Sequence, residues 1–548
     1  MPDHHSGLFG GVFDRGGADT SDSAWLRAML DTEAALARAL ERAGLAPPGS
    51  GQAVTRAAVP ENFSVPELGR LAALTGNPVP GLSRMLNRAV AATDTRAARA
   101  VHRGATSQDI IDTAAMLLAR RTIDVTIADL RAAAASTARL AAEHRETLQI
   151  GRTLLQQAVP VTFGVVAAGW LSGLDSAIEG LEAARKDRLA VQFGGAAGTL
   201  ASLGPRGAQV AELLAEELDL ENPPLPWHTE RLRLIDVATA MARVTAATGK
   251  IARDVTLLAQ TEVGEVSEGP VPDSAKPDSA KPDSAKPDSA KSGSAKSGSA
   301  KSGSAKSGSA KSGSAKSGSA KPGSGKPGSG KPGSGKSGGD QADNSNKRDA
   351  APRRGGSSAM PHKNNPVASI AILGCSRQVP GLLATLVASA EQEHQRAAGA
   401  WHAEWQPFAH LLGLGSSAAS WSAELLGGLR VDTARMAANL NASGGLPLAE
   451  RVTGLLAGAL GGPRAHDLVA GAAARSVASG IPLRDVILSA PELDESGEKI
   501  TAAQIEEALD PAGYLGVSDP FITAALRAHN GPGGNEPGGN EPSHRDIR

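Results

Sequence analysis

Apolar residues recur every three or four positions over long stretches of the chain, a spacing that predicts amphipathic helices. The clearest stripe covers residues 22–43 and consists of Leu26, Leu30, Ala34, Ala37 and Leu40. Serines before this stripe offer N-caps, and Gly44 followed by two prolines predicts where the helix ends. Four further long helices are predicted over residues 106–148, 163–189, 232–263 and 366–396.

Helices of this length exceed the roughly 8–20 residues usual in globular proteins and predict a long helical bundle. Sustained alternation of apolar and polar residues is absent, so no strands are predicted. Aromatic residues make up only 3% of the chain, while alanine, the strongest helix former, is abundant. Prolines at positions 447, 463 and 482 separate shorter helices near the C-terminus. The predicted fold class is therefore all-α.

One long segment differs from the rest in composition. Residues 272–336 are thirteen pentapeptide units of the types PDSAK, SGSAK and PGSGK, with 13 lysines and 4 aspartates, about +9 in charge. Such a segment cannot bury a core and is expected to be disordered; binding of polyanions is the alternative. The predicted divisions are an N-terminal helical domain (1–105), the first part of the bundle (106–268), the insert (269–352), a loop with the second part of the bundle (353–440), a C-terminal helical domain (441–529) and a tail (530–548).

The overall composition excludes several classes of protein. The net charge is −1 with 41% hydrophobic residues, which favours neither a nucleic-acid partner nor a membrane surface. The single cysteine, Cys375, excludes a disulfide framework and a cysteine-based zinc site, and we expect a reducing, cytoplasmic location. We expect no signal peptide and no membrane span, because no run of about 18 apolar residues is present.

The segment richest in candidate chemistry is residues 355–366, GGSSAMPHKNNP. Two glycines and two serines are followed by Lys363 and Asn365, and a proline then opens a helix. Backbone N–H groups, a lysine and an asparagine together favour binding of an anion, and a nearby lysine eases deprotonation of a serine. A Gly/Ser loop that merely continues the linker is the alternative, but the composition changes sharply here.

Residues 356–366 resemble the GSSxMPxKxNP signature of the fumarase/aspartase superfamily at every fixed position. The resemblance implies addition or removal of a group beta to a carboxylate through an aci-carboxylate intermediate, without metal or cofactor. It implies that Ser357 transfers the carbon-bound proton and that Lys363 and Asn365 stabilise charge. Homotetramers with active sites built from three subunits are also implied. Further substrate contacts are expected in this loop from Ser358, Met360 and His362.

Two upstream regions extend the resemblance. Residues 102–114 resemble the HxGxTSxDxxDTA pattern of adenylosuccinate lyase-like members, with a simple N-cap as the alternative. This places His102 as a candidate catalytic group, with Thr106, Ser107 and Gln108 as substrate ligands. In the second region, Gly-Arg-Thr precedes Leu154, where related lyases carry a histidine that protonates the leaving nitrogen. A second expected histidine aligns with Asn77.

The two missing histidines carry chemical information. An amine leaving group needs a general acid, whereas a carboxylate leaves as a stable anion. The sequence accordingly resembles the 3-carboxy-cis,cis-muconate cycloisomerase family, notably in residues 226–231 and 392–405. That resemblance implies lactone formation from a small tricarboxylate; an adenylosuccinate lyase-like enzyme and a non-catalytic scaffold are the alternatives. Further predicted substrate contacts, whose arginines could equally form structural salt bridges, are Asn77, Arg152, Thr153, Gln156, His228, Arg231 and Arg396.

Overall fold

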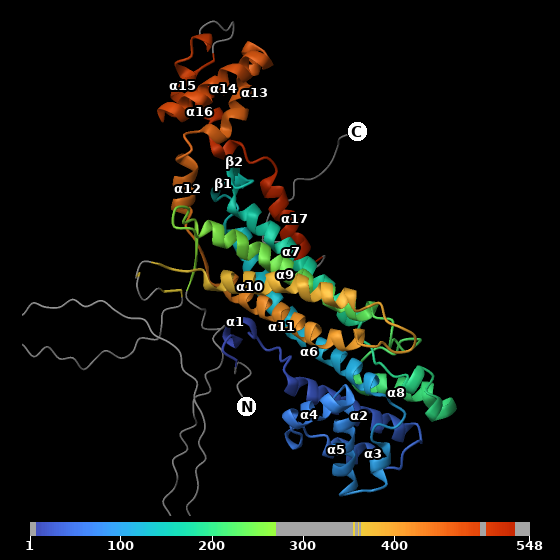
Figure 1. The fold of residues 1–548 in the computed structure, drawn as a ribbon. Coiled ribbons are helices and arrows are strands. Elements are labelled where there is room, and N and C mark those ends of the chain that lie inside the picture. The colour runs from blue at the N-terminus through green and yellow to red at the C-terminus, as the bar shows by residue number, and fades with distance from the viewer. Residues whose placement is uncertain (1–6, 270–354, 357–359, 361–362, 494–499, 532–548) are drawn as a thin grey trace, which may run out of the picture. The chain divides into compact units, whose positions relative to one another are not determined.

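The computed structural model describes residues 7–269, 355–356, 360, 363–493 and 500–531. Two units separate within the chain, and the second, residues 277–353, lies outside the described residues. The predicted insert and tail therefore fall almost entirely outside the described part of the chain. Helices dominate what is described, which confirms the predicted all-α fold (Figure 1).

The first helices form a core of their own. The short α1 (Gly10–Phe13) is followed by α2 (Asp22–Arg42), α3 (Ser50–Ala57), α4 (Val65–Thr75) and α5 (Val79–Ala91). Helix α2 begins as predicted, because the Ser21 hydroxyl accepts the N–H of Ala24 at 3.3 Å. Helix α5 is tied to residues 97–102 by Asn87, whose amide donates to the carbonyl of Ala98 at 2.7 Å.

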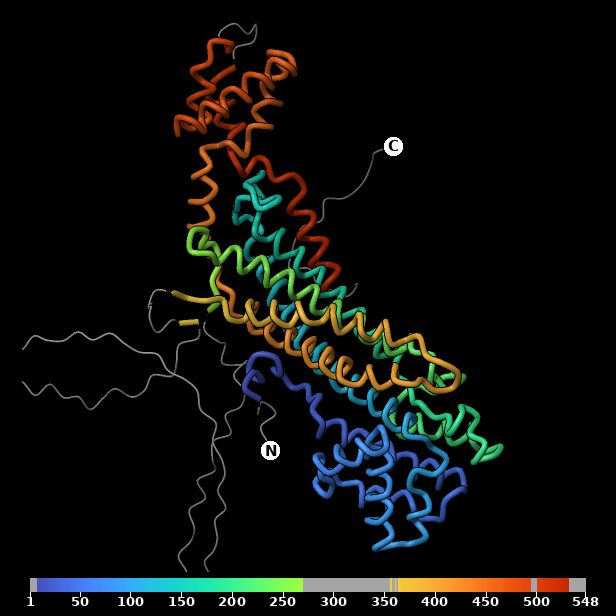
Figure 2. Tube along the Cα trace, viewed as in Figure 1, coloured from blue at the N-terminus to red at the C-terminus, as the bar shows by residue number. Residues whose placement is uncertain are grey.

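Five long helices lie side by side and hold the largest core (Figures 1 and 2). They are α6 (Ser107–Glu143), α7 (Phe163–Asp187), α9 (Leu232–Leu258), α10 (Val367–Ala388) and α11 (Ala400–Gly427). Small residues allow close approach: a Cβ on Gly415 would lie 2.6 Å from Cε of Met241, and one on Gly249 would lie 2.6 Å from Oγ of Ser376. The predicted starts of α6, α7, α9 and α10 agree with the structure to within one residue, whereas α11 was not among the predicted long helices.

Two small antiparallel sheets are present where the sequence predicted no strands, so that prediction was wrong. Strand β1 (Leu148–Thr153) pairs with β2 (Gln156–Thr162), and β3 (Val266–Glu268) pairs with β4 (Leu429–Val431). The β1–β2 register shifts between Ile150 and Arg152, which breaks the alternation a strand would show, and β3 and β4 are too short to show it. Helix α6 therefore ends at Glu143, before the predicted residue 148.

The C-terminal helices form a separate small core, from which the chain returns to the bundle. The C-terminal helices are α12 (Thr433–Asn441), α13 (Ala449–Leu460), α14 (Gly462–Ser479), α15 (Leu483–Leu488), α16 (Ala502–Ala508) and α17 (Ser518–Asn530). A further short helix, α8 (Gly207–Leu218), lies between α7 and α9 in the sequence. Helix α17 packs on α7, and His529 Nδ1 lies 3.0 Å from Oδ1 of Asp175. An ion pair between Arg145 and Asp519 adds to this attachment.

Helix α10 carries a largely uncovered apolar face. It packs against α9 and α11, yet Ile370 and Val387 stay 54% and 52% exposed. The sequence predicted no membrane span. Among the described helices, only α10 is long and apolar enough to cross a membrane. Core helices of soluble proteins meet the same criterion. The prediction that α10 continues to residue 396 was wrong, because the helix ends at Ala388 and a connection follows in which His394 has a φ of 49°.

Candidate active site

The first group of predicted site residues gathers at the start of α6, around the buried carboxylate of Asp109. This carboxylate accepts the N–H of Thr106 at 2.9 Å and the N–H groups of Gly194 and Gly195 at 3.0 and 2.9 Å. One of its oxygens lies 2.7 Å from Nε2 of His228. Asp109 thereby fixes the helix start, the 194–195 loop and a predicted histidine relative to one another.

His102 lies just before this helix start and is held by Glu33 of α2. Its Nδ1 lies 2.7 Å from Oε1 of Glu33, and its backbone N–H donates to Oε2 at 2.9 Å. The residue has a φ of 56°, in the left-handed region that a side chain rarely adopts. Burial by itself lowers the pKa of His102, but the hydrogen bond and charge of Glu33, with the charge of Asp109, raise it above its usual value. The imidazole is therefore biased toward its cationic form.

Arg231 is committed to the protein interior. Its side chain is 1% exposed, and the guanidinium donates to Asp112, to Glu404 and to the carbonyl of Trp227. These bonds use all five N–H groups of the guanidinium. Burial lowers the pKa of Arg231, but the charges of Asp112 and Glu404 outweigh it and the pKa is raised. Within the chain, Arg231 is therefore the centre of a structural ion-pair cluster rather than a free carboxylate ligand.

Two neighbours connect this ion-pair cluster to the helix start. Gln108 donates to Asp112 at 3.1 Å and to the carbonyl of His228 at 2.7 Å. Arg396 donates to the carbonyl of Gly195 at 2.6 Å and to the amide oxygen of Gln108 at 3.4 Å. Burial lowers the pKa of Arg396, with partial compensation from nearby carboxylates. Arg396 thus serves chiefly to hold the loop that Asp109 also holds.

A second group lies on the β1–β2 hairpin. Arg152 donates to both oxygens of Glu265, at 2.9 and 2.6 Å, while Thr153 and Gln156 are exposed. The two residues between the strands, Leu154 and Leu155, form the turn with φ values of 51° and 65° and are 96% and 70% exposed. Two exposed leucines in left-handed conformations are unfavourable in an isolated chain.

The third group is the signature loop, of which Ser357, Ser358 and His362 lie outside the described residues. Met360 and Lys363 are exposed, and the Lys363 N–H donates to the carbonyl of Met360 at 3.0 Å. The N–H and side-chain amide of Asn365 donate to the carbonyl of Gly355 at 2.9 and 3.1 Å. Gly355 has a φ of 74°, and a Cβ there would lie 2.5 Å from the Asn365 carbonyl, so glycine is required.

The helix that follows this loop is capped by a carboxylate from β3. Glu268 accepts the N–H groups of Ala368 and Ser369 at 3.0 and 2.9 Å and the Ser369 hydroxyl at 2.9 Å. Glu265, the partner of Arg152, stands three residues before Glu268. The second and third groups therefore lie at the same end of the bundle.

The first group lies at the opposite end of α6. Thr106 precedes that helix and β1 follows it, and a helix of 37 residues is about 55 Å long at 1.5 Å per residue. No single chain of this fold brings His102 and Thr106 to the hairpin or the signature loop. Within one chain the structure unites His102, Thr106, Ser107, Gln108, His228, Arg231 and Arg396, and separately the hairpin and loop residues.

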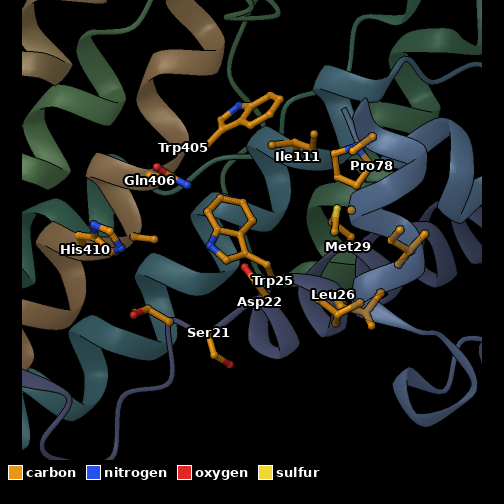
Figure 3. A pocket seen from close by; sticks show the side chains of 16 residues that line it. Ser21, Asp22, Trp25, Leu26, Met29, Pro78, Ile111, Trp405, Gln406 and His410 are labelled. Atoms are coloured by element: carbon orange, nitrogen blue, oxygen red, sulfur yellow. The ribbon is translucent and has the colours of Figure 1, made fainter. Parts of the chain in front are cut away.

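A cavity of about 620 Å³ is lined by residues of α2, α4, α6 and α11 and by Pro78, which precedes α5. Figure 3 shows the ring of Trp25 reaching between His410 and Gln406 on one side and Met29 and Pro78 on the other. None of the predicted site residues lines it, although Asn77 adjoins Pro78; the Asn77 side chain accepts the N–H of Val79 at 3.1 Å. No group of three or more His, Cys, Asp or Glu side chains among the described residues is placed to hold a metal ion.

Sequence reasoning missed the carboxylates that organise the first group. Glu33, Asp109 and Asp112 are at most 2% exposed and sit within apolar helical stripes. Acidic residues are seldom buried without a partner, so an acid on the buried face of a predicted helix was an available signal. The matching partners, His102, His228 and Arg231, could not be paired with them from spacing alone.

Comparisons with known proteins identify the family of the chain. A family model described as "Lyase" matches residues 11–295, and one described as "Adenylosuccinate lyase C-terminus" matches residues 445–525. A 3-carboxy-cis,cis-muconate cycloisomerase of Bradyrhizobium diazoefficiens is 37% identical over 93% of this chain and 94% of its own length. A nitrosuccinate lyase of Streptomyces davaonensis is 38% identical over 93% of this chain and 91% of its own.

The solved structures give the same grouping. The 3-carboxy-cis,cis-muconate lactonizing enzyme of Pseudomonas putida has a TM-score of 0.75 and 34% identity, and the match covers 95% of this chain and 99% of that one. A fumarate lyase from Mesorhizobium sp. BNC1 has a TM-score of 0.70 with 28% identity, covering 92% of this chain and 96% of that one. The chain therefore belongs to the lyase family of the fumarase/aspartase superfamily, and it is similar to the 3-carboxy-cis,cis-muconate cycloisomerases of that family.

Proposed function

We propose that the protein is a cycloisomerase that converts 3-carboxy-cis,cis-muconate to 4-carboxymuconolactone in protocatechuate catabolism. The observation that carries this proposal is Leu154, which occupies the hairpin turn where related lyases place a proton-donating histidine. A leucine cannot protonate a leaving amine, so the chemistry must release or add a group that is already a stable anion. An internal carboxylate is such a group.

The reaction is an isomerisation in which the ionised substrate, with three carboxylates, takes up one proton to give a lactone with two carboxylates. One carboxylate oxygen forms a bond to an alkene carbon, and the electron pair moves onto a second carboxylate to give the aci-carboxylate. A proton is then delivered to carbon, in our proposal from Ser357, and the serine regains a proton from solvent. Lys363, Asn365 and the helix start at Thr106 and Ser107 would stabilise the developing charge by fixed dipoles and cations.

The proposal needs a homo-oligomer, which we take to be a homotetramer with sites shared between chains. Its support is the length of α6, which separates the first group from the other two within one chain. The uncovered apolar face of α10 and the exposed leucines of the hairpin turn are surfaces that association would bury. We place this assembly in the cytoplasm, without a metal, a cofactor or a nucleic-acid partner.

The test is loss of ultraviolet absorbance of 3-carboxy-cis,cis-muconate with purified enzyme in the presence of EDTA. Wild type is expected to remove the conjugated diene, and the Ser357→Ala variant is expected to lose at least about 100-fold in kcat. The Ser369→Ala variant, altered at a serine of α10 whose hydroxyl donates to Glu268, is the matched control. Absence of diene loss with folded, oligomeric wild type would refute the proposal.

Elimination of nitrite from nitrosuccinate is a second candidate, favoured by the similarity to a nitrosuccinate lyase. Nitrite is also a stable anion, so Leu154 suits this reaction equally well. The same sample, assayed for release of nitrite and appearance of an unsaturated dicarboxylate, separates the two. Turnover of adenylosuccinate instead would contradict both, and turnover of none would favour a non-catalytic scaffold.

A further inference from the structure

The arginines expected to bind substrate carboxylates donate mainly to the protein itself. Arg231 is enclosed by Asp112 and Glu404, Arg152 is paired with Glu265, and Arg396 donates to backbone carbonyls. A tricarboxylate ligand still requires cations, because burying unpaired carboxylates is strongly unfavourable. Other cations must therefore face the site.

Helix α5 supplies such cations beside His102. A cavity of about 300 Å³ is lined by Ser83, Arg84, Asn87, Arg88, Val101 and His102. In the described part of the chain, neither the Arg84 nor the Arg88 guanidinium has a hydrogen bond or an ion pair, and both side chains are exposed. No acidic residue lines the cavity.

The spacing of the two arginines is informative. Residues four apart lie on the same helix face, and like charges at that spacing destabilise a helix. Some exposed arginines have an acidic partner, as Arg42 has Glu216, and others, such as Arg70, have none among the described residues. The Arg84–Arg88 pair has no such compensation among the described residues, and an anionic ligand would supply it. A purely solvated surface is the alternative.

His102 closes the cavity from the other side. Its Nδ1 is engaged by Glu33, so Nε2 is the ring atom left for a ligand. The charged groups that surround it are Arg84 and Arg88 on α5, Glu33 on α2 and Asp109 on α6. Burial lowers the pKa of His102, but Glu33 and Asp109 raise it overall, which favours the cationic form. The bond from Asn87 to Ala98 fixes α5 relative to the His102 segment.

We propose that this cavity binds a carboxylate of the substrate that takes no part in bond formation, with Arg84 and Arg88 as its main ligands. The inference rests on the proposed function, because it requires a substrate with a third carboxylate. The pair then determines specificity: it selects tricarboxylates over dicarboxylates that lack the additional group. Two guanidinium groups suit this role because they bind carboxylates through paired N–H donors.

Calorimetric titration of the purified enzyme tests the inference without turnover. The probes are tricarballylate, an unreactive tricarboxylate, and glutarate, the corresponding dicarboxylate. Wild type is expected to prefer tricarballylate, and the double variant Arg84→Gln/Arg88→Gln is expected to lose about 10-fold or more in affinity for it and most of that preference. Arg70→Gln, altered at an exposed arginine of α4, is the matched control and should behave as wild type.

The outcomes separate this inference from the proposed function. A folded double variant that keeps the wild-type preference overturns the inference, as does wild type that does not bind tricarballylate. If wild type binds tricarballylate through the arginine pair but does not turn over 3-carboxy-cis,cis-muconate, the inference stands and the proposed function fails. Equal melting temperatures of the variants and wild type exclude misfolding as the cause, since the substituted guanidinium groups have no partner in the described fold.

Discussion

Nδ1 of His102 lies 2.7 Å from Oε1 of Glu33, and the backbone N–H of the same histidine donates to Oε2 of that carboxylate at 2.9 Å. One buried acid thus controls both the charge of the imidazole and its left-handed backbone conformation. His102 can therefore contact a ligand only through Nε2, and the raised pKa favours the cationic imidazole in that contact.

Replacing Glu33 by glutamine is expected to lower the pKa of His102, because burial then acts without the opposing carboxylate. In wild type, the stabilisation from this pair is complete below the unfolded histidine pKa and is lost as pH rises through the raised folded pKa. The alkaline limb of kcat/KM should therefore move to lower pH in Glu33→Gln. Proton NMR titration of the imidazole measures the same shift, and an unchanged titration would contradict this account.

Arg231→Met is expected to destabilise the fold by about 3–5 kcal/mol, because it leaves Asp112 and Glu404 buried without a counter-charge. Urea unfolding of the variant measures this loss. Neutralising both acids in the same background, with Asp112→Asn and Glu404→Gln, should recover much of it. An Arg231→Met variant as stable as the control Arg70→Met would show that the cluster is not structural.

The hairpin turn offers a test of stability against activity. Changing Leu154 to Asn and Leu155 to Gly supplies residues that favour left-handed conformations and should stabilise the isolated chain by about 1–2 kcal/mol. The same change removes two exposed leucines from a surface that we expect association to bury, so the oligomer should weaken and kcat should fall, while the dissociated chain should melt at a higher temperature. A rise in both would dissociate the turn from catalysis.

Mixing two inactive variants tests whether sites are shared between chains. Ser107→Ala and Ser357→Ala alter opposite ends of the bundle, so a mixed tetramer would contain some sites with neither change. After joint unfolding and refolding at equal amounts, activity should reach about a quarter of wild type. Each variant refolded alone is the control, and a mixture no more active than either one would place both serines in the same chain's site.

Deletion of residues 272–336 is expected to leave kcat/KM unchanged, because the repeat contains no residue of the proposed site. Heparin-column retention of the full chain and the deleted chain measures the other possibility. Equal retention at physiological salt supports a spacer, since lysines spread one in five residues form a dilute charge. Strong retention that disappears on deletion would identify the repeat as a polyanion-binding segment.

Most of the long helices could be predicted from sequence because their apolar spacing is set by the helix itself. The stripe from Leu26 to Leu40 is buried as expected, and four of the five bundle helices begin within a residue of the predicted positions. The β1–β2 hairpin could not be predicted, because its irregular register breaks the alternation of apolar and polar residues that a strand would show.

The candidate site was only partly accessible to sequence reasoning. The signature loop and the Thr106 helix start could be located because their residue order is specific. Whether an arginine binds substrate or protein depends on long-range partners, as with Arg231 and Glu404, which are 173 residues apart. The cavity that Arg84 and Arg88 share with His102 could not be foreseen from the sequence, because it depends on how α5 lies against residues 101–102.

The cap that Glu268 places on α10 has a consequence for how this chain can evolve. It holds the residue at the start of the insert next to the helix that follows it, while Gly355 and Asn365 close the far side. With both ends fixed by the fold, each doubling of the intervening length adds only about 0.6 kcal/mol of closure entropy. Gain or loss of pentapeptide units should therefore change the free energy of unfolding only slightly.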